Sequence, residues 1–262
     1  MSREKSKVRT AQIKIKDSAV RRILNKQMKN ILTRERMAEE KLETEKLETE
    51  DPIYFTFDKE VSIPNGKKIL DFKLKELKIG EKVLTRNIEF NISGPTKVGI
   101  IGENGIGKTI LLRKIYKELE GRDDINVGYM PQDYIDALND EDVVMEYLVS
   151  DLEEVDTDLI TAYMGRIKLN WDEMNSKIGD LSYGQKAKLM VLKMMLDRKN
   201  VLLLDEPTRN LSAISNPVIR EVLNDFKGCI ISISHDRKFL KEVCDEVYRL
   251  EREGIRRVGI GK

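Results

Sequence analysis

The stretch that most constrains this chain is a glycine-rich run at residues 102–109, which reads G-E-N-G-I-G-K-T. It has the pattern G-x-x-x-x-G-K-T, whose glycines allow successive backbone N–H groups to point at a phosphate chain. An apolar run at 98–101 precedes it and an apolar-periodic run at 110–115 follows it, which predicts a strand, a turn and a helix start. An ordinary glycine-rich turn is the alternative. The flanking runs favour a phosphate-binding P-loop, with the helix N-terminus adding positive charge.

Each residue type in this loop suits a task in nucleotide binding. Lys108 would reach the β- and γ-phosphates, and the hydroxyl of Thr109 would bind Mg²⁺. We expect contacts to the nucleotide from Gly102, Glu103, Asn104, Gly105, Ile106, Gly107, Lys108, Thr109 and Ile110.

Composition limits the remaining possibilities. The 262 residues suffice for one large domain with an appendage, and 40% of them are hydrophobic. The net charge is only +1, so any affinity for nucleic acid must come from an uneven distribution of charge. Cys229 lies in an apolar run, which predicts a buried thiol and a reducing compartment. We find neither a long apolar span nor a secretory signal, so we expect a cytoplasmic protein.

Residues 1–50 differ from the rest because they contain no glycine, proline or aromatic residue. Residues 1–30 carry ten Lys or Arg against two Asp or Glu, whereas residues 31–50 carry four against seven. Apolar residues recur at helical spacing, so we expect one long helix over about 17–49, within a linker at 1–52. Two interpretations stay open: a solvated charged helix, or an arm that lies along nucleic acid.

The rest of the chain reads as an α/β domain over 53–262. Alternating residues at 69–77 and 83–92 predict antiparallel strands. Short apolar strands at 125–130, 201–204 and 228–234 alternate with helices, which predicts a mainly parallel sheet with helices on both faces. We expect a small helical subdomain at about 134–197.

Polar side chains follow three of these strands. Asp205 ends a buried strand, where a carboxylate can hold Mg²⁺, and Glu206 is the candidate general base. A solvated loop is the alternative for this pair. Gln132 could bond both the metal and the attacking water, so we assign it to catalysis and to the metal site. His235, the only histidine, directly follows another buried strand.

A fourth motif opens a strong helix at 186–196. It reads L-S-Y-G-Q, and Ser182, Gly184 and Gln185 lie where a helix N-terminus suits a phosphate.

These motifs, in this order, resemble the ATP-binding cassette (ABC) ATPases over roughly residues 70–250. The chain is most similar to the ABC-F branch because of its charged upstream helix, the short segment between Gln132 and Leu181, and the run at 207–220. The resemblance implies a P-loop fold, hydrolysis of ATP with Mg²⁺, and action on the ribosome, including antibiotic resistance. It implies that His235 contacts the γ-phosphate and that Ser182, Gly184 and Gln185 read the nucleotide held by an opposing cassette.

Several positions depart from the family pattern. Tyr183 replaces a glycine of the signature, and Ser212 replaces an aspartate that follows the second carboxylate motif. Ile79 stands where many cassettes stack an aromatic ring on adenine, which predicts looser base selectivity. One cassette is found where ABC-F proteins usually carry two. The chain thus resembles a linker end plus second cassette, either a natural half-protein or a fragment, that pairs with itself or another chain.

Two other classes of cassette remain as alternatives. The ATP-binding subunit of a membrane transporter normally begins near its first strand, so the basic helix disfavours it. Chromosome-maintenance and DNA-repair cassettes carry long insertions, for which residues 109–180 leave no room.

Overall fold

The computed structural model describes residues 62–134, 137–150, 152, 160, 163, 167, 169–209, 211 and 215–259. The chain divides into two compact units, and everything below concerns the larger, Thr56–Leu152 with Ile160–Lys262. The predicted helix at 17–49, the domain boundary after residue 52 and Ser212 lie outside the described residues. These three expectations therefore stay predictions.

The centre of this unit is a six-stranded sheet in the order β4-β5-β6-β3-β7-β8. Five strands pair in parallel, and β8 pairs antiparallel with β7. Every residue of β5 and β6 is buried, which explains their unbroken apolar sequences. The strands span Lys97–Gly102 (β3), Val127–Met130 (β4), Val201–Asp205 (β5), Cys229–Ile233 (β6), Glu246–Glu251 (β7) and Gly254–Val258 (β8).

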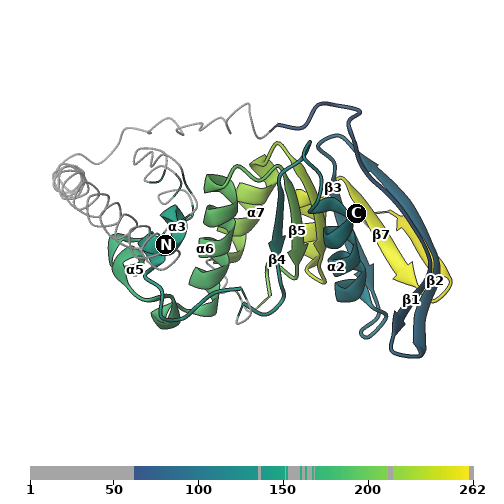
Figure 1. Cartoon of the computed structure of the whole chain (residues 1–262), viewed down its shortest axis with the longest axis horizontal. Coiled ribbons are helices and arrows are strands. Elements are labelled where there is room, and N and C mark those ends of the chain that lie inside the picture. Colours follow the sequence, from purple (N-terminus) through teal and green to yellow (C-terminus); the bar gives the residue numbers. More distant parts are fainter. Residues whose placement is uncertain are drawn as a thin grey trace, which may run out of the picture. The chain divides into compact units, whose positions relative to one another are not determined.

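Helices cover the sheet, as the alternation of strands and helices predicted. Figure 1 places α2 on one face, together with β1 and β2, and α6 and α7 on the other. The residues of α2 that face inward, such as Leu111 and Ile115, are fully buried. The helices span Lys108–Leu119 (α2), Val144–Val149 (α3), Trp171–Asn175 (α5), Tyr183–Leu196 (α6), Ser215–Asp225 (α7) and Arg237–Val243 (α8), with a 3-10 turn at Ile178–Asp180.

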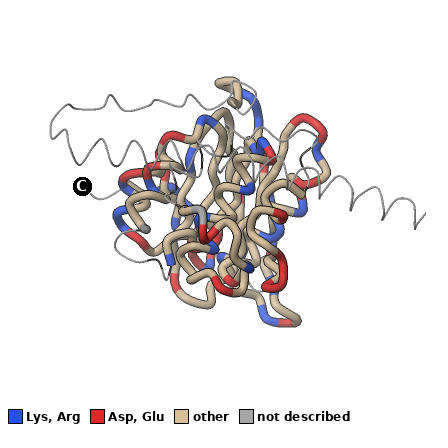
Figure 2. The backbone as a smooth tube through the Cα atoms, turned by 90° about the vertical axis from the view of Figure 1, so that its left-hand side faces the viewer, with Lys and Arg blue, Asp and Glu red and all other residues tan. Residues whose placement is uncertain are grey.

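Charged residues of both signs are intermixed along the backbone of the described part (Figure 2). Neighbouring opposite charges pair on its surface, for example Lys73 with Glu89 and Arg256 with Glu251. Exposed pairs of this kind contribute little stability.

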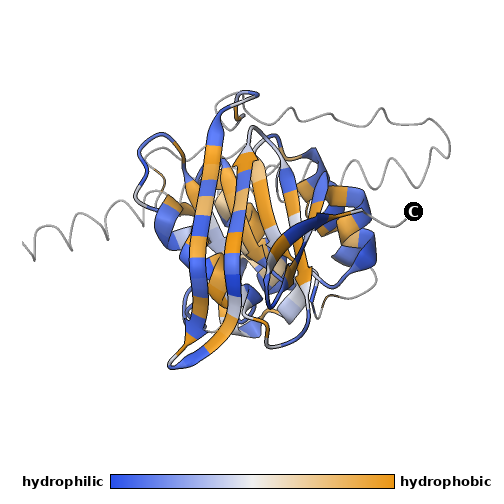
Figure 3. Cartoon of the chain, turned by 90° about the vertical axis from the view of Figure 1, so that its right-hand side faces the viewer, coloured by the Kyte–Doolittle hydropathy of each residue, from blue (hydrophilic) through white to orange (hydrophobic). Residues whose placement is uncertain are grey.

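The predicted antiparallel strands are confirmed as β1 (Lys68–Ile79) and β2 (Lys82–Ser93). Apolar and polar side chains alternate along both strands (Figure 3), so one face is buried and the other is solvated. Phe72, Ile88 and Phe90 belong to the same buried cluster as the inner face of α2. The hairpin is therefore packed onto the helix that follows residues 102–107, and this packing positions the candidate site.

Candidate nucleotide-binding site

The glycine-rich run forms the turn between β3 and α2, as predicted. Gly105 and Gly107 have φ angles of 79° and 101°, a left-handed conformation that favours glycine. A Cβ atom on Gly107 would lie 2.7 Å from Cδ2 of Leu77 and 3.0 Å from Cδ1 of Leu84. The turn therefore needs glycine at position 107 twice over, for its backbone angle and for the close approach of β1 and β2.

Lys108 is the first residue of α2, and its side chain folds back over the loop. Its Nζ donates to the carbonyl oxygens of Gly102 and Glu103 at 2.9 and 3.0 Å. Burial lowers the pKa of this ammonium, while the nearby carboxylates of Glu206 and Asp205 raise it. A cation held by neutral carbonyl groups at the mouth of the loop is suited to gaining phosphate oxygens, which are stronger acceptors.

Asp205 is the best indication of a metal site. It is 1% exposed at the end of β5, and within the described residues neither carboxylate oxygen has a hydrogen-bonding partner. Burial raises its pKa, and the neighbours Thr109, Arg113 and Lys108 only partly favour the charged form. A buried carboxylate without a partner is costly, whereas Mg²⁺ is commonly held by one or two carboxylates together with substrate phosphates. Asp205 and Thr109 therefore fit a Mg²⁺ ion.

No cluster of three or more His, Cys, Asp or Glu side chains suited to holding a metal occurs among the described residues. This agrees with a Mg²⁺ site that is completed by phosphate and water.

Glu206 occupies an unusual backbone conformation beside His235. Its φ is 55°, which is costly for a residue with a Cβ, and its N–H donates to the carbonyl of Ile233 at 2.9 Å. Its carboxylate accepts from the backbone N–H of His235 at 3.3 Å and lies 3.6 Å from that residue's Nε2. Burial raises the pKa of Glu206, and His235 partly opposes the shift. The structure thus brings together the predicted base and the predicted histidine.

Sequence reasoning missed one residue that supports this pair. Arg220 of α7 is buried, and its Nε donates to Glu242 at 2.6 Å while Nη1 lies 4.0 Å from Asp236. Asp236 in turn accepts from the N–H groups of Lys238 and Phe239 and caps α8. Arg220 therefore holds the segment that follows His235. The only signal for it was a basic residue among the apolar positions of α7.

Gln132 lies two residues beyond the end of β4, and its backbone carbonyl accepts a hydrogen bond from the hydroxyl of Tyr183. Since β3, β4, β5 and β6 run parallel, their carboxyl ends share one edge of the sheet. Gln132, residues 102–109, the pair Asp205–Glu206 and His235 follow those four ends. The roles assigned to these residues stay predictions, but their common location is as expected.

The L-S-Y-G-Q motif opens α6, as predicted. Ser182 is the N-cap, and its side chain and that of Gln185 cap each other's backbone N–H groups at 3.3 and 2.7 Å. Nε2 of Gln185 also donates to Glu173 of α5. The side chain of Gln185 is thus engaged in fixing the start of the helix. Within the motif, this leaves the backbone N–H groups near Ser182 and Gly184 as the groups suited to a phosphate.

Ile79 is 57% exposed and is the one large apolar side chain found exposed among the described residues. It lies two residues after Leu77, which contacts the P-loop glycine, so the two side chains share a face of β1. This location agrees with the predicted contact to a nucleotide base.

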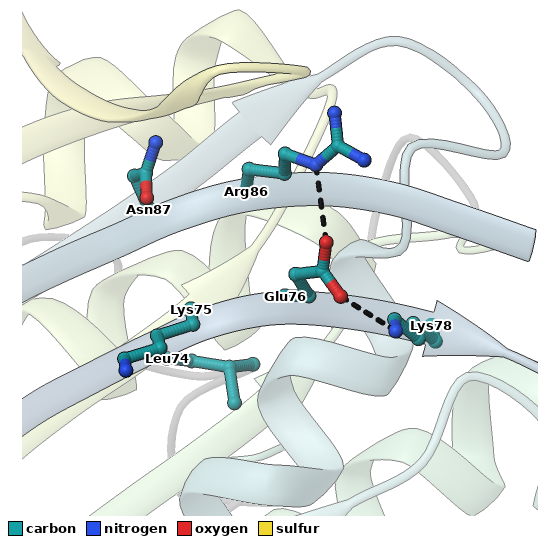
Figure 4. A pocket seen from close by; sticks show the side chains of 6 residues that line it. All are labelled: Leu74, Lys75, Glu76, Lys78, Arg86 and Asn87. Carbon is teal, nitrogen blue, oxygen red and sulfur yellow. Dashed lines mark hydrogen bonds and ion pairs between the residues drawn. The ribbon is translucent and has the colours of Figure 1, made fainter.

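A separate open hollow lies on β1 and β2 (Figure 4), lined by Leu74, Lys75, Glu76, Lys78, Arg86 and Asn87. Glu76 pairs with Nε of Arg86 at 3.2 Å and with Lys78 at 2.5 Å. These cations therefore already have a carboxylate partner, and the hollow plays no part in the site described above.

Comparison with known proteins agrees with this geometry. A family model described as "ABC transporter" matches residues 85–209. "ABC transporter F family member 2" of Arabidopsis thaliana is 30% identical over 199 residues, covering 73% of this chain and 29% of that protein. "Energy-dependent translational throttle protein EttA" of Escherichia coli K12 is 30% identical over 220 residues, covering 66% of this chain and 39% of that protein.

A dimeric structure of the ATP-binding cassette MJ0796 bound to ADP and Pi has a TM-score of 0.60. It is 18% identical and covers 74% of this chain and 99% of that one. The likeness supports the fold alone.

The fold and the arrangement of its motifs define a P-loop cassette of the ABC type. Its relatives place it more narrowly, and the chain carries an ABC-F family cassette. The chain spans about 28–39% of the length of these relatives. None of the helices in the described part combines the length and apolar character needed to cross a bilayer.

Proposed function

We propose that this cassette binds ATP with Mg²⁺ and hydrolyses it to ADP and phosphate. The observation that carries the proposal is the buried, unpartnered carboxylate of Asp205 beside Thr109, next to the Glu206–His235 pair. A bound Mg²⁺ ion supplies charge neutralisation for the β- and γ-phosphates.

The chain's own groups divide the remaining work. Residues 102–109 orient the phosphates through backbone N–H groups, and Lys108 neutralises developing charge. Glu206 accepts a proton from the water that attacks the γ-phosphorus, while the bond to the ADP oxygen breaks. Gln132 orients that water, and His235 contacts the γ-phosphate. Phosphate release from ATP, with Mg²⁺ and with EDTA, tests this assignment. Release only with Mg²⁺ is expected, and none in either case contradicts it.

The raised pKa of Glu206 predicts a pH dependence of turnover. A general base works only when ionised, so activity is present at high pH and is lost as pH falls through the pKa of the base. Because burial raises this pKa above its ordinary 4.5, the acid limb of the kcat profile should lie above pH 4.5. Initial rates at saturating Mg-ATP, measured across pH in buffers of constant ionic strength, locate the limb. A limb at or below 4.5 argues against Glu206 as the base.

We further propose that two cassettes close around ATP, because Ser182 and Gly184 lie at a helix start suited to the phosphate of an opposing nucleotide. The partner is a second copy of this chain in a two-fold arrangement, or a separate cassette.

The proposed place of action is the ribosome, in the cytoplasm. Two observations support it: the relationship to the translational throttle protein EttA, and the strongly basic residues 1–30. Protection against antibiotics that target the ribosome is the finer form of this role, tested by the drug sensitivity of cells that express the chain. An ATP-binding transporter subunit is the second candidate, favoured by the description of the matching family model. Cofractionation with ribosomes or with membranes separates the two roles.

The basic arm yields a prediction that rests on sequence alone. Replacing Arg21, Arg22, Lys26 and Lys29 with Gln should weaken ribosome binding and flatten its log–log salt dependence by up to about four, roughly one for each lost phosphate contact. ATP affinity should not change. Sedimentation with ribosomes at several salt concentrations measures the slope.

A matched control replaces four basic residues of the acidic half of the arm, Arg34, Arg36, Lys41 and Lys46, with Gln. If both variants keep the wild-type slope, the arm is a solvated helix and makes no contact with RNA.

A further inference from the structure

The start of α6 is tied to the segment that follows β4. The hydroxyl of Tyr183, the first residue of α6, donates to the backbone carbonyl of Gln132 at 2.9 Å, across 51 positions of sequence. Its ring stacks on that of Tyr134, with centroids 4.5 Å apart and planes at 29°. Tyr134 is only 2% exposed, so this ring provides a firm support.

Two further contacts support the tie. Nζ of Lys186, one turn further along α6, pairs with Asp140 at 2.7 Å. Arg209, three residues after Glu206, lies close enough to lower the pKa of the Tyr183 phenol, while burial and Asp133 raise it. The first turn of α6 therefore meets the segments that carry Gln132 and Glu206.

We propose that Tyr183 is a positioning residue, which fixes Gln132 relative to the start of α6 through its hydroxyl. The inference rests on the proposed ATP hydrolysis, in which Gln132 serves the cassette's own nucleotide while Ser182 and Gly184 serve the opposing one. One hydrogen bond then couples the two sites. A glycine at position 183 has no side chain that could make this bond.

The tie has a physical consequence for Gln132. The residue lies in a loop after β4, where it has few backbone contacts of its own, so a bond to its carbonyl restricts the direction of its side chain. Water must be held within a fraction of an ångström of its attack position for efficient reaction. The hydroxyl therefore acts on turnover more than on binding, because the phosphates are held mainly by residues 102–109.

The test is a double-mutant cycle with Tyr183→Phe, which keeps the stacked ring and removes the hydroxyl. We expect kcat to fall about threefold to tenfold, the effect of one hydrogen bond, with the Kd for ATP unchanged within about twofold. In a Gln132→Ala background, the same substitution should have no further effect on kcat. Tyr248→Phe is the matched control, since it removes a 2.9 Å bond from a phenol to Glu246 outside the site.

Unchanged kcat in Tyr183→Phe, or an equal loss in the Gln132→Ala background, overturns the proposal. A second readout needs no turnover: backbone hydrogen exchange at residues 131–134 should be faster in Tyr183→Phe than in wild type. Unchanged exchange there also overturns the tie. If the wild-type chain releases no phosphate but exchange rises as expected, the proposed hydrolysis fails while the positioning contact stands.

Discussion

Glu206→Gln is expected to lower the rate of phosphate release by about two to four orders of magnitude, the usual contribution of a general base. Glutamine has nearly the shape of glutamate and can accept from the N–H of His235, so the loop at φ 55° should persist. It cannot take up a proton at neutral pH. The affinity for Mg-ATP should stay within about twofold of wild type, because residues 102–109 are untouched. Single-turnover release of labelled phosphate and calorimetric titration measure the two quantities.

The same variant should accumulate in a paired, ATP-bound form. Pairing requires intact ATP, since the γ-phosphate is the group that would contact both cassettes. Sedimentation velocity with Mg-ATP should therefore show a shift from monomer to dimer that ADP does not produce. Glu221→Gln is the matched control, because Glu221 is an exposed carboxylate on the outer side of α7. Equal turnover by Glu206→Gln and wild type would remove Glu206 from its assigned role.

Lys108→Ala should weaken ATP binding itself, by about tenfold or more, because the ammonium would make charge-assisted hydrogen bonds to phosphate oxygens. It also removes the contacts from Nζ to Gly102 and Glu103, so the loop loses part of its preorganisation. Calorimetry with a slowly hydrolysed ATP analogue and Mg²⁺ measures the affinity without interference from turnover.

Lys117→Ala is the control, since it removes an exposed lysine from the last turn of the same helix. It should bind nucleotide as wild type does. If Lys108→Ala binds as tightly as this control, residues 102–109 do not hold the phosphates.

Much of the site could be predicted because its parts are local in sequence. Gly105 and Gly107 mark the turn by residue type alone, and the buried strand before Asp205 is visible as an unbroken apolar run. Parallel strands then bring Gln132, Asp205 and His235 to one edge without any knowledge of side-chain packing. The start of α6 was equally visible, because Ser182 and Gln185 have the spacing of a capping box.

The contacts that join these parts could not be predicted. The bond from Tyr183 to Gln132 and the ion pair between Arg220 and Asp236 connect residues far apart in sequence, and no local pattern marks them. The strained backbone at Glu206 is also invisible in sequence, since glutamate gives no signal for a positive φ. The engagement of Gln185 with Glu173 likewise depends on how α5 packs against α6.

The central claim is that this cassette hydrolyses ATP by closing on a second cassette. The most direct test is the steady-state rate of phosphate release from saturating Mg-ATP, measured over a wide range of protein concentration. If copies of this chain pair, activity per molecule should rise with concentration and then saturate, and adding Glu206→Gln protein should not restore a rate to Lys108→Ala protein. Activity per molecule that stays constant down to the lowest concentration, or no Mg²⁺-dependent release at any concentration, would contradict it.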